Sequence, residues 1–157
     1  MRYKQEVKWA IILFTVTIIW MVFENLMGWH GVHIGDHATY TNIYDLLFTG
    51  VFALAFREKR NRTEYFPFKN AFLFGLRITL VITLLSPITQ TIIHRLIAPE
   101  FFPNIIKFAV DNKVLNQEAA EAHFNLKSYI FQNIIGTLIL GIICSLLFAF
   151  LFKRKKQ

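Results

Sequence analysis

The sequence predicts an all-α polytopic membrane protein, built as a four-transmembrane-helix bundle. Two observations lead to this fold class: the composition is unusually apolar, and the apolar residues fall into four long stretches. Of the 157 residues, 55% are hydrophobic and 17% are charged, whereas soluble domains carry roughly 25% charged residues. The mean hydropathy is +0.44. This composition excludes a disordered chain and a collagen-like fibre, and the single cysteine, Cys144, excludes an intrachain disulfide or a cysteine-based zinc cage.

Each apolar stretch has about the length that a membrane-spanning helix needs. Roughly 20 apolar residues cross about 30 Å of hydrocarbon at 1.5 Å per residue. We expect spans at about 8–27, 41–56, 70–97 and 128–152, in one membrane domain that covers residues 1–157. The last stretch has no charged residue, whereas the second is short and carries Asp45. The second span is therefore the weakest of the four by composition.

The basic residues gather on one side of these spans. Twelve of them flank the spans on the side of the two termini: Arg2, Lys4, Lys8, Arg57, Lys59, Arg60, Arg62, Lys69, Lys153, Arg154, Lys155 and Lys156. Four lie on the other side: Arg95, Lys107, Lys113 and Lys127. Because cytoplasmic loops are rich in Lys and Arg, we expect both termini in the cytoplasm. The net charge of +7 then reflects topology at a lipid bilayer and predicts no nucleic-acid partner.

The connection at 98–127 is long and is predicted to contain short extra helices on the outer side. Apolar residues recur at helical spacing in 104–112, and Asn116 is a plausible N-cap for a helix over Gln117–His123. The 104–112 stretch has an apolar side that suits either the membrane surface or the helical bundle. We favour packing against the bundle, because lone interfacial helices are usually more basic.

Three runs of sequence carry a family resemblance: GWHGVHIGDHATYTNIY at 28–44, LLSPITQ at 84–90 and NQEAAEAHFNLKSYIFQNIIG at 116–136. Together they resemble the bacterial family catalogued as domain of unknown function 4199, which consists of small integral membrane proteins with four predicted helices. The resemblance extends from Lys8 to about Leu151. It implies the fold and a place in the bacterial inner (cytoplasmic) membrane, and it supplies no catalytic residues.

Polar residues concentrate at the predicted outer ends of the four spans. They are Glu24, Asn25, Asp45, Gln90, His94, Gln132 and Asn133. A carboxylate inside the membrane costs at least about 2.5–3.5 kcal/mol, so Glu24 and Asp45 need compensation. Protonation and pairing with Arg77 are two alternatives, although we expect Arg77 to snorkel toward the cytoplasmic headgroups. The third is that these residues line a polar vestibule that opens outward.

The first outer loop is rich in histidine and is a candidate metal site. Its possible ligands, with Glu24 or Asp45 as an additional oxygen donor, are His30, His33, Asp36 and His37. Imidazole and carboxylate groups bind zinc, copper or iron(II). The spacing matches no established metal signature. A structural interpretation has greater weight: the histidines form a polar network, and Asp36 or Thr39 caps the next helix.

These observations favour a non-enzymatic membrane protein, an accessory, binding or assembly component with an outward-facing vestibule. No catalytic motif is present, and the only cofactor that the residues suggest is a divalent metal. A small transporter is one alternative, which would require a homo-oligomer because four helices are few for alternating access. A membrane-embedded metalloenzyme that uses the outer histidines is the other. A homo-oligomer or another membrane protein is the expected protein partner.

Overall fold

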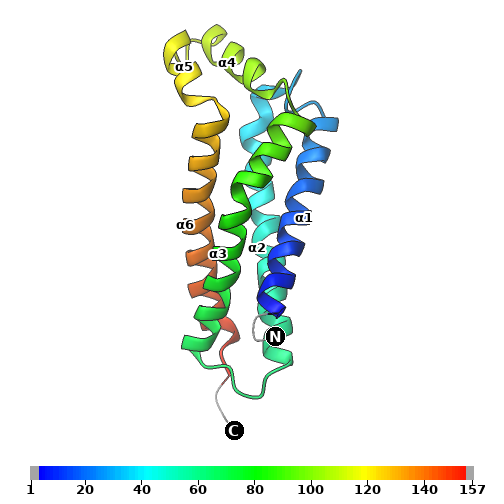
Figure 1. The fold of residues 1–157 in the computed structure, drawn as a ribbon, viewed down its shortest axis with the longest axis vertical. Helices are drawn as coiled ribbons and strands as arrows, with labels where there is room; N and C mark the ends of the chain where they lie inside the picture. Colours follow the sequence, from blue (N-terminus) through cyan, green and yellow to red (C-terminus); the bar gives the residue numbers. More distant parts are fainter. Residues whose placement is uncertain (1–3, 155–157) are drawn as a thin grey trace.

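The computed structural model describes residues 4–154, which fold into helices with no strand among them. Four long helices lie side by side (Figure 1): α1 (Lys4–Leu26), α2 (His37–Asn61), α3 (Phe68–Ile92) and α6 (Leu126–Phe152). Four short elements complete the chain: η1 (Ile34–Asp36), η2 (Ile93–Ile97), α4 (Phe101–Asp111) and α5 (Gln117–His123). The end that carries α4 and α5 is called the head, and the opposite end, where the chain begins and ends, is called the base.

Three helical segments are long and apolar enough to cross a membrane: Lys4–Leu26, Phe68–Ile97 and Leu126–Phe152. The second predicted span lies within α2, which is long enough but too polar to meet the same standard. The composition of the helices thus supports three of the four expected spans. Of the basic residues that predict the orientation, Arg2, Lys155 and Lys156 lie outside the described residues.

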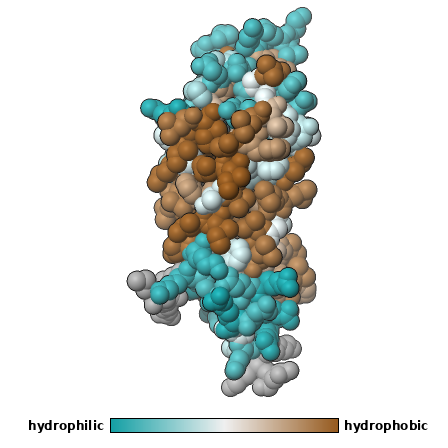
Figure 2. All heavy atoms as spheres, turned by 90° about the vertical axis from the view of Figure 1, so that its right-hand side faces the viewer, coloured by the Kyte–Doolittle hydropathy of each residue, from teal (hydrophilic) through white to brown (hydrophobic). Residues whose placement is uncertain are grey.

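The surface of the long helices is apolar between two polar ends. Figure 2 shows a hydrophobic band across the middle of one face, with hydrophilic residues at the head and at the base. Large apolar side chains are exposed on all four long helices, among them Ile19, Leu46, Leu84 and Leu146, which are 63%, 73%, 79% and 46% exposed. Such a contiguous apolar surface is unfavourable in water and suits contact with lipid.

Helices α3 and α6 form the most extensive contact in the molecule, and glycines make it possible. A Cβ added at Gly75 would lie 2.5 Å from Ser145 Oγ and 2.7 Å from Phe56 Cζ. A Cβ added at Gly141 would collide with the side chain of Thr79. Small residues at these positions let the two backbones approach closely, as is common between membrane helices.

The half of the bundle toward the base is filled by phenylalanine. Its buried rings are Phe48, Phe52, Phe56, Phe66, Phe74 and Phe148. The Phe56 ring is central, with centroids 5.4 Å from that of Phe74 and 5.7 Å from that of Phe148. Tilted and edge-to-face rings at this spacing pack densely and leave no polar group to satisfy.

The base is closed by polar contacts between elements. Phe66 and Arg154 exchange two backbone hydrogen bonds of 3.1 and 2.7 Å, which tie the α2–α3 connection to the end of α6. Glu58 accepts hydrogen bonds from Lys8 Nζ at 2.5 Å and Trp9 Nε1 at 2.8 Å. The adjacent ammonium group of Lys8 lowers the pKa of Glu58. These contacts join α1 to α2 where the helices reach the polar end.

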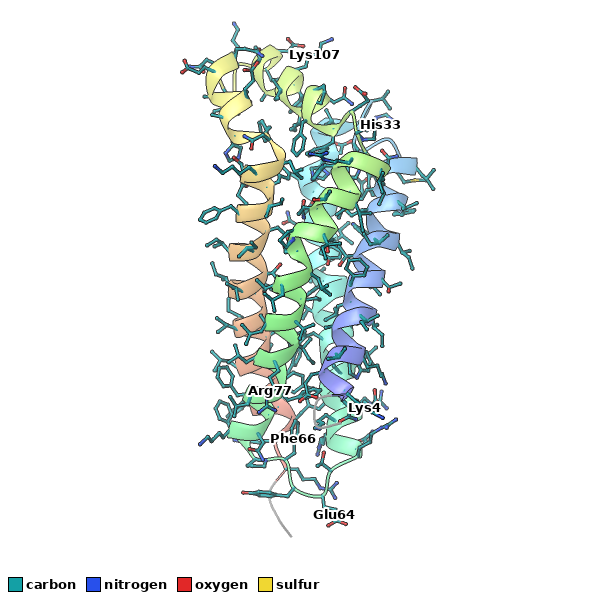
Figure 3. The ribbon with its side chains drawn as sticks, viewed as in Figure 1. Lys4, His33, Glu64, Phe66, Arg77 and Lys107 are labelled. Atoms are coloured by element: carbon teal, nitrogen blue, oxygen red, sulfur yellow. The ribbon has the colours of Figure 1, made fainter. Side chains whose placement is uncertain are left out.

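Arg77 has a partner that the sequence analysis did not identify. Its Nη1 lies 3.4 Å from Oε1 of Glu6, whose side chain is only 4% exposed. Figure 3 places Arg77 near the base, close to the level of Lys4 and Phe66. The side chain is 41% exposed, so its position near the polar end agrees with the snorkelling prediction. The ion pair with Glu6 is an addition to that prediction.

The head contains both of the predicted short helices. Asn116 Oδ1 accepts a hydrogen bond of 2.8 Å from Ala119 N, which confirms the predicted N-cap of α5. Helix α4 extends from Phe101 to Asp111, and Phe101 packs against His94 and Tyr129 of the bundle. Asp36 holds the N-cap position of α2, but its side chain makes no capping hydrogen bond. The proposed capping role of Asp36 is therefore not realised in this form.

Candidate functional site

The centre of the candidate site is Glu24, near the head end of α1. Its side chain is fully buried. Trp20 lies one helical turn earlier on the same face of α1, and its Nε1 donates a hydrogen bond of 2.6 Å to Glu24 Oε1. This bond fixes one carboxylate oxygen and leaves Oε2 available for other partners.

The loop after α1 turns His30 back toward Glu24. Gly28 has a φ of +80°, a left-handed conformation that glycine adopts without a steric penalty. The backbone N–H groups of Gly31 and His33 both donate to Gly28 O, at 3.0 and 2.9 Å. Asn104 of α4 donates a hydrogen bond of 3.1 Å to His30 O. The loop is thus held from both sides, and His30 is 3% exposed.

Two imidazole rings converge on a single oxygen of Glu24. His30 Nε2 lies 3.0 Å and His37 Nδ1 lies 3.5 Å from Glu24 Oε2. The ligand atoms of these three residues all lie within 4.8 Å of one another. His37 Nδ1 is buried and has no hydrogen-bond partner, since its position relative to Glu24 does not meet hydrogen-bond geometry. Glu24, His30 and His37 are called the triad below.

An aromatic ring from the head segment lies against the triad. The Phe101 centroid is 5.4 Å from that of His30 and 5.0 Å from those of His37 and His94. Phe101 is 1% exposed. His94 lies in η2, a π-helical turn of the kind that often marks functional sites. Its Nε2 is 3.1 Å from Gln90 Oε1. Phe101 thus shields the histidines from solvent at the head.

A cavity of about 500 Å³, called the head cavity, lies beside the triad. His30 and His37 line it, together with five of the residues predicted for the vestibule: Asp45, Gln90, His94, Gln132 and Asn133. A second cavity of about 260 Å³ lies deeper and shares four lining residues with the first: Tyr44, Asp45, Gln132 and Asn133. Polar side chains therefore extend from the head into the middle of the bundle.

The head cavity lies where α2 and α6 separate. Toward the base these helices contact each other, with the Phe52 and Phe148 centroids 6.3 Å apart and Thr49 Oγ1 3.8 Å from Cys144 Sγ. Toward the head, Asn133 on α6 instead accepts a hydrogen bond from Ser86 Oγ of α3. Asp45 and Gln132 are exposed on the rim of the cavity. The space between the two helices is thus open and polar at one end and filled with aromatic rings at the other.

Some predicted site residues lie elsewhere. Glu24 does not line the head cavity, but it contacts His30 and His37, which do. Asn25 is exposed and lines a different cavity, beside α4. His33 and Asp36 are exposed and belong to no described cluster of metal-ligand atoms. Figure 3 shows His33 at the edge of the head. The backbone is the cause, because residues 27–33 form turns instead of a helix, so the i, i+3 spacing that grouped His33 with His30 does not place them on one face.

Two contributors to the site were missed. Trp20 had a usable signal, because a residue four positions before Glu24 shares its helix face. Phe101 had none, because only the tertiary fold brings α4 over the histidines.

The chain matches the model of the family described as "Protein of unknown function (DUF4199)" over residues 8–154. No curated protein and no solved structure matches it. The match covers nearly the whole chain, including α2, α3, α6, most of α1, the triad and the residues that line the head cavity. The protein is therefore a member of the family designated domain of unknown function 4199.

Proposed function

We propose that this protein crosses the bacterial inner membrane four times, with both termini in the cytoplasm, and binds a small polar ligand in the head cavity from the outer side. The observation that carries the proposal is the position of the cavity. It contains the polar side chains of several helices at one end of an otherwise apolar bundle. An integral membrane protein with an accessory or binding role fits this arrangement.

The contacts of α2 support its assignment as the fourth span. It lies alongside the other three long helices in Figure 1. One side of α2 buries Phe48, Phe52 and Phe56 inside the bundle, while Leu46 and Leu54 are 73% and 50% exposed, as on the other long helices. Its polarity comes partly from Asp45, which lines the head cavity. The low hydropathy of α2 thus comes from the residues that line the head cavity and from the charged residues at its base end.

The charge at the two ends supports the orientation. Besides Arg77 within α3, nine described Lys and Arg residues lie at or near the base: Lys4, Lys8, Arg57, Lys59, Arg60, Arg62, Lys69, Lys153 and Arg154. Four lie toward the head: Arg95, Lys107, Lys113 and Lys127. The positive-inside rule then places the base in the cytoplasm and the head cavity on the outer side.

Cysteine labelling in intact cells tests both the orientation and the vestibule. In a Cys144→Ser background, a membrane-impermeant maleimide should label Lys113→Cys and Gln132→Cys and should not label Arg60→Cys. Permeabilised cells provide the control, because position 60 should then react. Labelling of position 60 alone in intact cells would contradict the orientation. Labelling of 113 without 132 would contradict an open vestibule.

The exposed polar rim favours a second candidate role, assembly with another membrane helix. Asn42, Asp45 and Gln132 are exposed within the depth of the long helices, and lipid is a poor environment for them. A second copy of the chain or another membrane protein would cover them. Cross-linking between Gln132→Cys residues of two copies in native membranes tests this role, and the absence of a cross-linked dimer would contradict the homo-oligomer. Transport would further require a path through the Phe-filled base half.

A further inference from the structure

We infer that Glu24, His30 and His37 form a binding site for one divalent transition-metal ion of the zinc type, exposed to the head cavity. The inference deepens the proposed function, because it names a ligand for the same outer cavity. The metal-ligand atoms would be Glu24 Oε2, His30 Nε2 and His37 Nδ1. Two imidazoles and one carboxylate, with a further position left open, form a ligand set known from zinc sites.

The distances fit ligands that share one ion. A tetrahedral zinc ion bound at about 2.0–2.2 Å holds neighbouring ligand atoms about 3.3–3.5 Å apart. Of the two separations from Glu24 Oε2, the 3.5 Å to His37 Nδ1 matches this spacing, whereas the 3.0 Å to His30 Nε2 is a hydrogen-bond distance that would have to lengthen slightly. The longer one, to His37 Nδ1, is not a hydrogen bond and leaves a buried nitrogen without a partner. An ion between these atoms would satisfy that nitrogen with small movements of the side chains.

The electrostatics of the site favour a cation. Glu24 is fully buried, and an isolated carboxylate in such a place is strongly unfavourable. Among the described residues, its ion-pair partners are His30 and His37, and no Lys or Arg pairs with it. A divalent ion bound by two neutral imidazoles would compensate the negative charge of the Glu24 carboxylate, and all three side chains would be metal ligands.

The surroundings supply part of the support that metal ligands usually have, although the other ring nitrogen of His30, Nδ1, has no hydrogen-bond partner. Trp20 Nε1 holds the other carboxylate oxygen at 2.6 Å, and Asn104 fixes the backbone of His30. Phe101 covers the imidazole rings. Partners of this kind orient the ligands, and their loss typically weakens metal affinity by about 10–100-fold. Because both histidines line the head cavity, the open coordination position would be reached from there.

Cobalt(II) binding to the full-length protein in detergent tests the site. Co²⁺ replaces zinc in sites of this kind and reports its ligands through its visible absorption. The wild type should bind one Co²⁺ per chain, displaced by Zn²⁺. Glu24→Gln and His37→Ala should lose this binding, and Trp20→Phe should weaken it about tenfold. His33→Ala is the matched control, because His33 is an exposed histidine of the same loop and should leave binding unchanged.

The outcomes distinguish loss of a metal site from loss of folding, and they test the metal site independently of the open vestibule. Thermal unfolding of each variant shows whether it is folded, and His37→Ala is the milder ligand change because His37 is 19% exposed. Absence of stoichiometric binding in the wild type would overturn the inference. Binding as strong as that of the wild type in folded Glu24→Gln and His37→Ala would also overturn it, and so would loss of binding in His33→Ala. The assay needs no membrane, so it can fail while the labelling experiment succeeds, and the reverse.

Discussion

The base half and the head half of this bundle contain the same four long helices, but one half is densely packed and the other contains a polar cavity. Toward the base, Phe56 and its neighbouring aromatic rings fill the space between α2, α3 and α6. Toward the head, α2 and α6 diverge around a polar cavity of about 500 Å³. The densely packed part of the protein and the part proposed to bind a ligand therefore lie at different positions along the helix axis. A dense aromatic half can hold the helices in place while the other half remains open.

The largest expected effect follows from emptying the base half. Phe56→Ala removes a fully buried ring that contacts rings from four segments, and we expect a loss of about 3 kcal/mol in the free energy of unfolding. Unfolding in mixed micelles of increasing SDS content measures it. Phe131→Ala is the control, because Phe131 is 66% exposed and its loss should cost less than about 0.5 kcal/mol. Equal losses would show that the base half is not the source of stability.

The next effect concerns the close approach of α3 and α6. Gly141→Ala forces a Cβ into Thr79, and overpacking of this kind costs about 1–3 kcal/mol. Gly136→Ala, one turn earlier on the same helix, adds its methyl group to open space and should be neutral or stabilising, because alanine favours helices. The same SDS titration compares the two variants. If Gly136→Ala were the more destabilising, the assigned α3–α6 contact would be wrong.

Arg77→Leu tests the ion pair at the base. The change leaves the buried carboxylate of Glu6 without the Arg77 guanidinium and should cost about 1–2 kcal/mol, which is the lower part of the range for a stranded buried charge, because Arg77 is 41% exposed and partly solvated. Adding Glu6→Gln should restore most of that stability. Adding Asp45→Asn should not. Rescue by Asp45→Asn instead would assign Arg77 to the head cavity.

The smallest effect is a pH dependence at the edge of the base. Lys8 lowers the pKa of Glu58 from its ordinary value of 4.5. The folded state therefore gains stability from this carboxylate above pH 4.5, and the gain disappears as the pH falls through the lower folded pKa. Since Lys8 is 46% exposed, the gain should be at most about 1 kcal/mol.

Thermal unfolding of the wild type and Glu58→Gln measures this gain. The difference between them should be present at neutral pH and absent in acid. A difference that is constant with pH would refute the assigned ion pair.

The head half was predictable at the level of residues and less so at the level of geometry. Apolar length and the distribution of charge predicted the order of the long helices, and the outer polar residues indicated Asp45, Gln90 and Asn133 as neighbours. The loop was harder, because helical spacing grouped His33 with His30, whereas the chain from 27 to 33 forms turns instead of a helix and the two side chains diverge. The spacing of residues along the sequence does not show in which direction the side chains of such a turn will point.

The base half shows the same limit. The sequence contains 17 phenylalanines, but a count of rings does not show which ones pack against one another inside the bundle. The sequence analysis did not consider Glu6 as a partner of Arg77, and only the position of α3 beside α1 brings the two side chains together. Contacts between helices that are distant in sequence depend on how each helix is rotated about its axis and how far it is shifted along the bundle. The residue pattern of a single helix determines neither.

The central claim is that solvent enters the head half and stops at the base half, and reactivity along α6 tests it most directly. In intact cells, an impermeant maleimide should label Asn133→Cys and Thr137→Cys, placed one at a time in a Cys144→Ser background, because both positions line the cavities. The native Cys144, which is 3% exposed, should remain unlabelled in the wild type until SDS unfolds the protein. Labelling of native Cys144 at the rate of position 133, or no labelling at 133, would contradict the account.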